Sequence, residues 1–380
     1  MSEYEYYEFQ TVDRRLTAEQ QAEMRQLSKR VDLSPTRAAF NYSYGSFRGD
    51  PLEVLEKHFD ALLYIANWGT KMLAFRFPAG AVDAGSLQPY LSGEDEGYAG
   101  ELLTTPQHLV LRFEIREYES YGWIEGEGLL DPLIPLREAI LRGDLRALYL
   151  FWLRCAMDRA GWAEDEEGYE SPEALVEPPV PPGLGQLDPA LEAFAEFFAI
   201  DQDLIAAAAA ASPALEATTE PLERWVALLP EAERNAFLVR VARGETDVGA
   251  ELLRRLREAG GAHGPATLPG RRTFAELRTA AQRQQQLRLQ REREAAERAR
   301  LAKLEALARR EAEVWASVSG LLARRTASGY DEGVALLAEL RDLAVHRGQQ
   351  AVFDARLAEV TGPYAGSAAL QRRLREKGLV

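Results

Sequence analysis

The sequence predicts an α+β fold, in which a small N-terminal mixed sheet with helices is followed by a mainly α-helical bundle, one long charged helix and a helical-hairpin tail. Three observations support this prediction. Segments with the apolar alternation of strands lie before about residue 117. Later segments have helical spacing and are interrupted by Gly and Pro. The stretch 271–319 contains neither Gly nor Pro, and a helix of that length would extend about 75 Å.

The composition is that of an ordinary globular protein. The 380 residues suffice for two or three domains with their own cores. Hydrophobic residues make up 46% of the chain and charged residues 28%, and no apolar run is long enough for a membrane span. The acidic, aromatic N-terminus does not resemble a secretory signal peptide. We therefore expect a cytoplasmic protein of bacterial type that makes no membrane contact.

The cysteine content and the charge distribution limit which kinds of site the chain can form. Cys155 is the single cysteine, which excludes an intramolecular disulfide and every multi-cysteine zinc site. The net charge of −15 is uneven, because residues 261–380 hold 21 Lys and Arg against 14 Asp and Glu, whereas residues 1–260 hold 24 against 46. An acidic N-terminal part argues against nucleic-acid binding by the whole chain, but a local basic surface stays possible.

The first predicted domain, residues 1–117, contains four strands and two helices. The strands are expected at 3–12, 37–45, 70–78 and 108–119, and the helices at 17–30 and 51–68. Thr17 and Gln20 have the spacing of a capping box, and Asp50 followed by Pro51 begins the second helix. That helix would bury Leu52, Leu55, Phe59, Leu62 and Leu63. We expect the helices to cover one face of the sheet.

The loop 44–51 is the first candidate binding site. In a functional interpretation, Arg48 and Asp50 contact a ligand, and together with Trp68 they line an enzyme site in the N-terminal domain. In a structural interpretation, which we favour, Gly45 and Gly49 shape a turn and Asp50 caps the following helix.

The second predicted domain, residues 118–260, is a bundle of short helices with an acidic, Pro-rich linker near 163–187. The helical segment around Cys155 is strongly apolar, so Cys155, Tyr149 and Trp152 are expected in the core.

Two helical regions complete the chain. The long helix is predicted at 271–325 and begins with the capping-box pair Thr273 and Glu276. The tail, 326–380, has three short amphipathic segments, which suggest a helical hairpin similar to a TPR unit.

Arginines give the long helix its candidate chemistry. Six of them lie close together, at Arg283, Arg288, Arg291, Arg293, Arg298 and Arg300. Of these, Arg283, Arg288, Arg291 and Arg298 are the candidates for phosphate contacts. The alternative is a solvated or coiled-coil helix with ion pairs four residues apart. We favour this alternative because no aromatic residues alternate with the arginines, as they do in single-strand binders.

No catalytic or metal-binding motif is recognisable. The four histidines lack the spacing of a helical metal pair, and there is no Walker loop, G-x-S-x-G elbow or H-E-x-x-H helix. We therefore expect no cofactor and no metal, and the sequence favours a protein that is not an enzyme. A pair of carboxylates distant in sequence could still form an acid–base site.

Several segments resemble a family of uncharacterised bacterial proteins. They are YEYYEFQTVDRRLT, FRGDPLEVLEKHFDALLYIANWGTKML, WVALLPEAERNAFLVRVARGE and the tail. The tail alone also resembles the C-terminal helical segments of bacterial SWIM zinc-finger proteins. A SWIM finger needs Cys and His ligands, which a chain with Cys155 alone cannot supply. The resemblance implies membership of a protein-interaction system.

We accordingly expect a non-catalytic scaffold or adaptor that binds a protein partner or self-associates, with the long helix pairing with itself or with that partner. An apolar stripe between Leu301 and Leu322 supports this interpretation. Two alternatives stay open: nucleic-acid association through the arginines, and an enzyme of unknown class with its site in the N-terminal domain.

Overall fold

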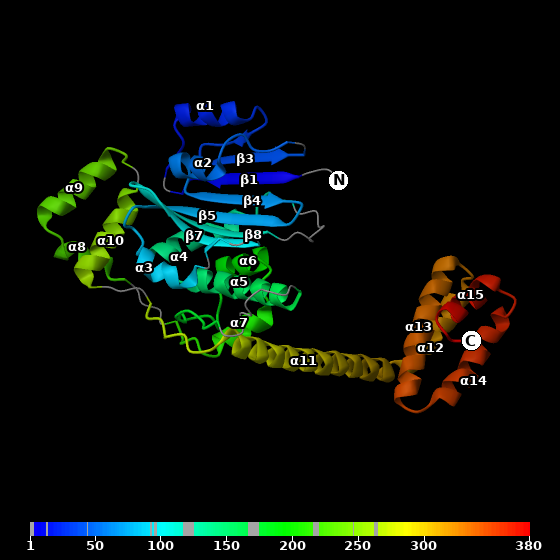
Figure 1. The fold of residues 1–380 in the computed structure, drawn as a ribbon. Coiled ribbons are helices and arrows are strands. Elements are labelled where there is room, and N and C mark those ends of the chain that lie inside the picture. The colour runs from blue at the N-terminus through cyan, green and yellow to red at the C-terminus, as the bar shows by residue number, and fades with distance from the viewer. Residues whose placement is uncertain are drawn as a thin grey trace. The chain divides into compact units, whose positions relative to one another are not determined.

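The computed structural model describes residues 4–12, 14–43, 45–91, 93–94, 97–116, 125–165, 175–215, 220–245, 247–261 and 265–380 (Figure 1). The chain divides into two compact units, Met1–Gln285 (unit 1) and Gln286–Val380 (unit 2). Each unit has a hydrophobic core of its own.

Unit 1 is built on a sheet of eight described strands in the order β2-β3-β1-β4-β5-β8-β7-β6 (Figure 1). The strands are β1 (Glu5–Gln10), β2 (Asp32–Leu33), β3 (Arg37–Tyr42), β4 (Ala61–Ala66), β5 (Thr70–Pro78), β6 (Gly93–Glu94), β7 (Tyr98–Thr104) and β8 (His108–Arg116). Every described pairing is antiparallel, whereas the sequence predicted a mixed sheet. The α+β fold class is confirmed.

Side chains on both faces of this sheet are buried. Leu111 and Phe113 of β8 belong to one core, as the alternation predicted, while Val110 belongs to a second core on the opposite face. The same alternation in β5 places Phe75 in the first core and Met72 in the second. Successive side chains of a strand point to opposite faces, so both faces need a cover.

Helices supply both covers (Figure 1). On the face of the second core lie α1 (Ala18–Leu27) and α2 (Pro51–His58), which contribute Met24 and Leu55. The first core is closed by α4 (Pro135–Leu141), α5 (Arg146–Asp165), α6 (Pro189–Phe197) and α7 (Gln202–Ala209). The other described helices of unit 1 are α3 (Ala84–Leu87), α8 (Leu222–Leu228), α9 (Glu231–Ala242), α10 (Val248–Gly260) and the 3₁₀ turns η1 (Gln88–Tyr90) and η2 (Asp131–Leu133).

The shared core changes the predicted domain boundaries. The prediction separated 1–117 from 118–260, but side chains from both ranges lie in one core, and the compact unit continues to Gln285. Tyr149, Trp152 and Cys155 of α5 are buried in that core, as expected. A sheet face that is apolar along several strands cannot be left in water, so the helices that follow it in sequence complete the same unit.

The predicted helix 51–68 is wrong in its second half. The chain is helical only at Pro51–His58 and then forms strand β4 at Ala61–Ala66. Leu62 and Leu63 therefore point to opposite faces of the sheet, in different cores, and do not share a helical stripe. The segment is apolar and short, a pattern that suits a buried strand and a buried helix equally well. Pairing with β1 and β5 decides for the strand.

The predicted long helix consists of two helices. They are α11 (Phe274–Arg309) and α12 (Glu311–Ala323), separated at Arg310, whose φ of −117° and ψ of 13° lie outside the helical region. Phe274 and Leu277, at the start of α11, are buried in the core of unit 1. Leu304, near the other end of α11, is buried in the core of unit 2.

Unit 2 is a helical bundle. It contains the end of α11 together with α12, α13 (Ala327–His346), α14 (Gln350–Thr361), the 3₁₀ turn η4 (Gly362–Tyr364) and α15 (Ala368–Glu376). Trp315 of α12, Leu337 of α13, Phe353 of α14 and Leu370 of α15 lie in its core, in agreement with the predicted apolar spacing of the tail. None of the described helices of the chain combines the length and the apolar character of a membrane span.

Separate cores predict separate unfolding. Replacing buried Trp315 by Ala should destabilise unit 2 by about 3–5 kcal/mol and leave the unfolding of unit 1 unchanged, because the cavity forms in one core only. The matched variant Phe113→Ala should lower the transition of unit 1 alone. Differential scanning calorimetry of the full chain measures both transitions. A single transition that both substitutions lower equally would contradict the two-core division.

Candidate functional site

A hollow that involves a predicted site residue lies beside Arg48. It has a volume of about 800 Å³, within the range of ligand sites. Its lining, which we name the basic groove, consists of Arg25, Gln26, Leu27, Ser28, Lys29, Arg30, Asn41, Tyr42, Ser43 and Arg48. These residues come from the end of α1, the turn after it, the end of β3 and the loop before α2.

Local sequence features determine how the segments on either side of this groove fold. The predicted capping box forms, since the Thr17 hydroxyl accepts from the Gln20 backbone N–H and the Gln20 side chain accepts from the Thr17 N–H. Helix α1 ends at Leu27, and after the C-cap residue Ser28 the chain turns, with the Val31 N–H donating to the Ser28 carbonyl at 3.4 Å. On the other side, the turn that precedes Arg48 contains Gly45 in a left-handed conformation, with a φ of +91°.

Charge distinguishes the basic groove from the rest of unit 1. Four cations line it, Arg25, Lys29, Arg30 and Arg48, and all four are exposed. The lining contains no carboxylate, and none of the four forms an ion pair with a described residue. Elsewhere in this acidic unit, arginines are typically paired, as for Arg257 with Glu220 at 2.6 Å. Unpaired cations around a hollow produce a positive potential that attracts anions.

Tyr42 forms the inner wall of the groove. Its ring packs edge-on against Tyr7 at 6.3 Å and Phe47 at 6.5 Å between ring centroids. Burial raises the pKa of Tyr42 above its ordinary value, although the charge of Arg48 opposes the shift. The Tyr42 phenol is therefore protonated and neutral at pH 7.

The other N-terminal candidates do not join Arg48 in this groove. The Asp50 carboxylate caps α2 by accepting from the Leu52 N–H at 2.8 Å, as the structural interpretation predicted. Trp68 is 40% exposed in the turn between β4 and β5, two strands away from β3, and does not line the groove. The three predicted residues thus do not form one site.

Most arginines of α11 are solvated, whereas Arg278 and Arg288 are half-buried. Arg283, Arg291 and Arg298 are exposed, as is every residue from Gln290 to Arg300. Arg288 pairs with Glu292 at 3.0 Å, and the Arg298 guanidinium donates to the backbone carbonyl of Glu294 at 3.3 Å. These contacts four residues apart follow the alternative that the sequence favoured.

A buried ionic cluster at one end of the sheet was missed by sequence reasoning. Asp60, only 1% exposed, accepts from the Arg76 guanidinium at 2.6 Å and from the Val12 N–H at 2.8 Å. Arg137 of α4 lies 4.0 Å from the same carboxylate and donates to the Arg76 carbonyl at 2.9 Å. Asp247, which precedes α10 with a φ of +62°, lies 3.9 Å from Arg76. The residues are far apart in sequence, so no local pattern could reveal them.

The groups in this cluster shift one another's protonation. Burial would raise the pKa of Asp60, but the charges of Arg76 and Arg137 and the Val12 N–H outweigh it, so the pKa lies below its ordinary value. His108, whose imidazole is 3.1 Å from the Arg76 guanidinium, has a lowered pKa through burial and that positive charge. The cluster ties β4, β5, β8 and α4 together, which is a structural role.

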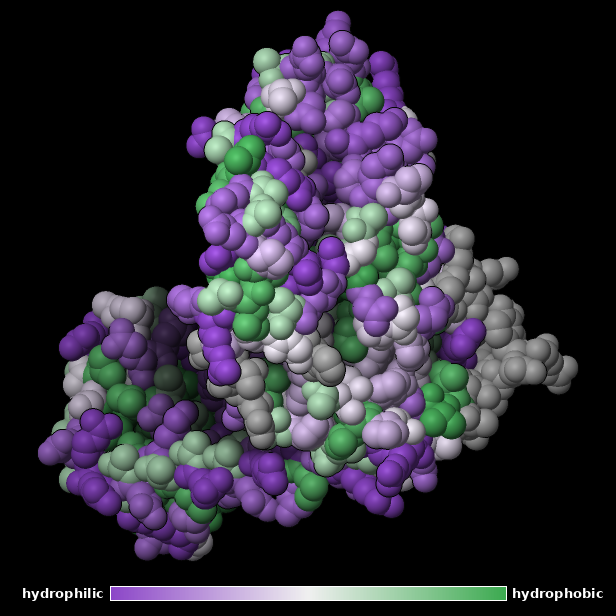
Figure 2. Space-filling view, turned by 90° about the vertical axis from the view of Figure 1, so that its left-hand side faces the viewer, coloured by the Kyte–Doolittle hydropathy of each residue, from purple (hydrophilic) through white to green (hydrophobic). Residues whose placement is uncertain are grey.

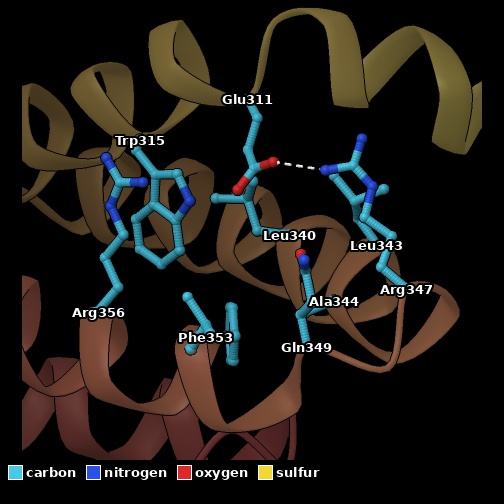
Figure 3. A pocket seen from close by; sticks show the side chains of 10 residues that line it. Glu311, Trp315, Leu340, Leu343, Ala344, Arg347, Gln349, Phe353 and Arg356 are labelled. Carbon is cyan, nitrogen blue, oxygen red and sulfur yellow. Dashed lines mark hydrogen bonds and ion pairs between the residues drawn. The ribbon is translucent and has the colours of Figure 1, made fainter.

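A smaller hollow in unit 2 lies between α12, α13 and α14 (Figure 3). Its volume is about 30 Å³, enough for about one water molecule. Figure 3 shows Arg356 lying over the Trp315 ring, at 4.8 Å from the centroid, and the Glu311–Arg347 ion pair of 2.9 Å at its rim. These contacts fill the space, so the hollow is a packing feature.

Helices α8–α10 carry exposed apolar side chains on a small core of Trp225, Leu229 and Leu256. On the side of the molecule that Figure 2 presents, hydrophobic residues occur in small groups among hydrophilic ones. The large exposed apolar residues of α8 and α9 are Leu222, Val226, Leu228, Leu238, Val239 and Val241. Within the described part of the chain, no group of three or more His, Cys, Asp or Glu side chains is arranged to hold a metal ion.

The buried cluster predicts an acid-sensitive stability. Asp60→Ala should lower the free energy of unfolding by about 3–5 kcal/mol at pH 7, because it removes the carboxylate that buried Arg76 contacts at 2.6 Å and leaves, among the described carboxylates, only Asp247 at 3.9 Å. The contribution of Asp60 is present above its unfolded-state pKa of about 3.9 and is lost as the pH falls through the lower folded-state pKa. Urea titrations of unit 1 between pH 2 and 7 measure it. The exposed capping variant Asp50→Ala is the control and should cost about 1 kcal/mol. Equal losses for the two variants would contradict the assigned role of Asp60.

No protein-family model, no curated protein and no solved structure matches this chain. The resemblance of its segments to an uncharacterised bacterial family and to SWIM-protein tails therefore stays a prediction. What can be inferred about function comes from the geometry of the two units.

Proposed function

We propose that this protein is a non-catalytic scaffold or adaptor that acts through protein–protein interactions. The observation that carries the proposal is the construction of α11. Phe274 and Leu277 anchor its start in the core of unit 1, and Leu304 and Leu307 anchor its end in the core of unit 2. Between these anchors, Gln290–Arg300 is exposed on every side. A helix that is polar all round is typical of a solvent-bridging connection or of a helix stabilised by ion pairs four residues apart. Its exposed surface is open to contact with a partner.

Surfaces on unit 1 add support. The basic groove offers unpaired cations, and α8 and α9 expose apolar side chains such as Leu238, which is 66% exposed. Exposed apolar groups with a polar surround are common at protein-binding surfaces. A chain with two independently built cores and several such surfaces suits a protein that brings partners together.

The test removes the exposed part of α11 and spares both cores. Deleting the eleven residues Gln290–Arg300 takes out about three helical turns and so nearly preserves the rotation of the helix. We expect both thermal transitions to stay within about 1 °C, because only exposed side chains are lost. Multi-angle light scattering should show a smaller assembly, or a partner that the full chain retains should be lost. A deletion of 271–325 would be unsuitable, because it removes the anchors Phe274 and Trp315 from the cores.

Partner retention is measured with tagged full chain and tagged deletion variant in the same cell extract. Every protein that the full chain retains is then purified and titrated against both forms by calorimetry. An unchanged mass together with unchanged affinities for every retained protein would refute a role for α11 in association. A reaction catalysed by the purified full chain on a retained molecule would refute the non-catalytic proposal.

A second candidate function, nucleic-acid association, has the exposed arginines of α11 in its favour. Arg288, Arg291 and Arg298 lie on one side of the helix at 100° per residue, although Glu292 pairs with the first of them. This function predicts oligonucleotide binding that weakens steeply with salt. Reversing the three arginines to Glu should weaken binding at least tenfold at low salt, while replacing them by Lys should preserve it. Fluorescence anisotropy measures both, and no binding by the native chain at low salt would exclude this function.

A further inference from the structure

Strand β3 has an open edge beside the basic groove. β2 pairs only with Ala38 and Ala39 of β3, so the strand continues past its neighbour towards Tyr42. The Ser34 N–H donates to the Arg37 carbonyl at 2.8 Å, which shows that Arg37 turns its backbone groups towards β2. On the other side, the Thr36 carbonyl accepts from the Thr11 N–H at 2.9 Å, next to β1.

Alternation then fixes where the Asn41 backbone points. Backbone groups of successive residues in a strand point to opposite sides, so Arg37, Ala39 and Asn41 direct theirs away from β1. Ala39 is paired with Asp32 of β2, but no described residue pairs with Asn41 on that side. The Asn41 N–H and carbonyl therefore lie at the wall of the basic groove, which Asn41 itself lines.

The edge of β3 and the four cations thus border the same hollow. Lys29 and Arg30 follow α1 on one wall, and Arg48 and Arg25 complete the lining. Extended peptides bind such edges by adding a strand, with main-chain hydrogen bonds supplying affinity and side-chain contacts supplying specificity. Cations beside the edge select acidic side chains.

We propose that the basic groove binds an extended acidic peptide segment of a partner protein, which adds to β3 as a strand alongside Asn41. This inference rests on the proposed function, because it assigns a partner chemistry to one surface of the adaptor. The peptide lies beside Asn41, past the point where the pairing of β2 with β3 ends, and its carboxylates contact Lys29, Arg30 and Arg48.

The lining favours a peptide over a nucleotide. Tyr42 is the one aromatic residue among those that line the groove, so successive bases would find no second ring on which to stack. The unpaired backbone donor and acceptor of Asn41 match a peptide main chain. Charged residues also protect sheet edges from unwanted pairing, and that role alone would leave the groove without a peptide ligand.

The probe is a fluorescein-labelled peptide of five Glu-Thr repeats, blocked at both ends, titrated into the full chain at low salt. We expect saturable binding, with at least tenfold weaker binding for the uncharged Gln-Thr peptide. We also expect binding at least tenfold weaker for a Glu-Thr peptide N-methylated on alternate residues, because methylation removes main-chain donors and keeps the charge. Hydrogen–deuterium exchange of the Asn41 amide should slow in the complex.

Matched protein variants locate the site. Lys29→Glu with Arg30→Glu should weaken binding at least tenfold, whereas Arg142→Glu with Arg243→Glu, an equal change of charge at two exposed cations outside the groove, should leave it within twofold. All four substitutions are at exposed sites, and calorimetry confirms that each variant keeps both thermal transitions.

Three results would overturn the inference. The first is no binding of the Glu-Thr peptide, and the second is equal binding of the N-methylated peptide. The third is displacement of the peptide by tripolyphosphate or by a single-stranded oligonucleotide, if either binds the same cations more tightly than the peptide does. In those cases the cations recognise charge alone or only protect the edge. Such a result leaves the adaptor proposal standing if the α11 deletion still abolishes association. If the adaptor proposal is wrong, the α11 deletion leaves association unchanged. The peptide titration is a separate measurement and does not depend on that result.

Discussion

Burial of β4 and β5 on both faces is the constraint on which the rest of unit 1 depends. Leu63 and Phe75 lie in one core, and Leu62 and Met72 lie in the other. Neither face can be left to water, because each exposed apolar Å² costs about 25 cal/mol. The chain therefore has to supply α1 and α2 for one face and α4–α7 for the other, and the two predicted domains become one unit.

This arrangement also determines where polar groups gather. The strand ends at one end of the sheet are enclosed by the covering helices, so Asp60 and Arg76 are buried and must satisfy each other. The margin at β3 lies outside that enclosure. There the two-residue β2 is too short to cover its neighbour, and the end of α1 and the loop before α2 leave a groove with unpaired cations. Positive side chains thus stabilise the fold where Arg76 meets Asp60, whereas those of the basic groove are available for binding.

The packing of unit 2 is simpler than that of unit 1, because its helices need only bury apolar stripes against one another. Trp315, Leu337 and Phe353 meet in its core, and after the break at Arg310 helix α12 packs on α13. The exposed stretch of α11 has no such partner in the described residues. Its solvated arginines, the basic groove and the apolar surface of α8 and α9 are the features that the adaptor proposal uses.

The sequence by itself determined what depends on neighbouring residues. The Thr17 capping box, the Asp50 cap, the alternation of β8 and the apolar spacing of the tail were all predicted and confirmed. Arg48 was identified as a candidate, although the cations that surround it were not. Only the tertiary structure decided that 61–66 is a strand, that the long helix breaks at Arg310, and that Asp60 meets Arg76. The physical reason is that each depends on partners distant in the chain: two flanking strands, a facing helix, or a charge on the next strand.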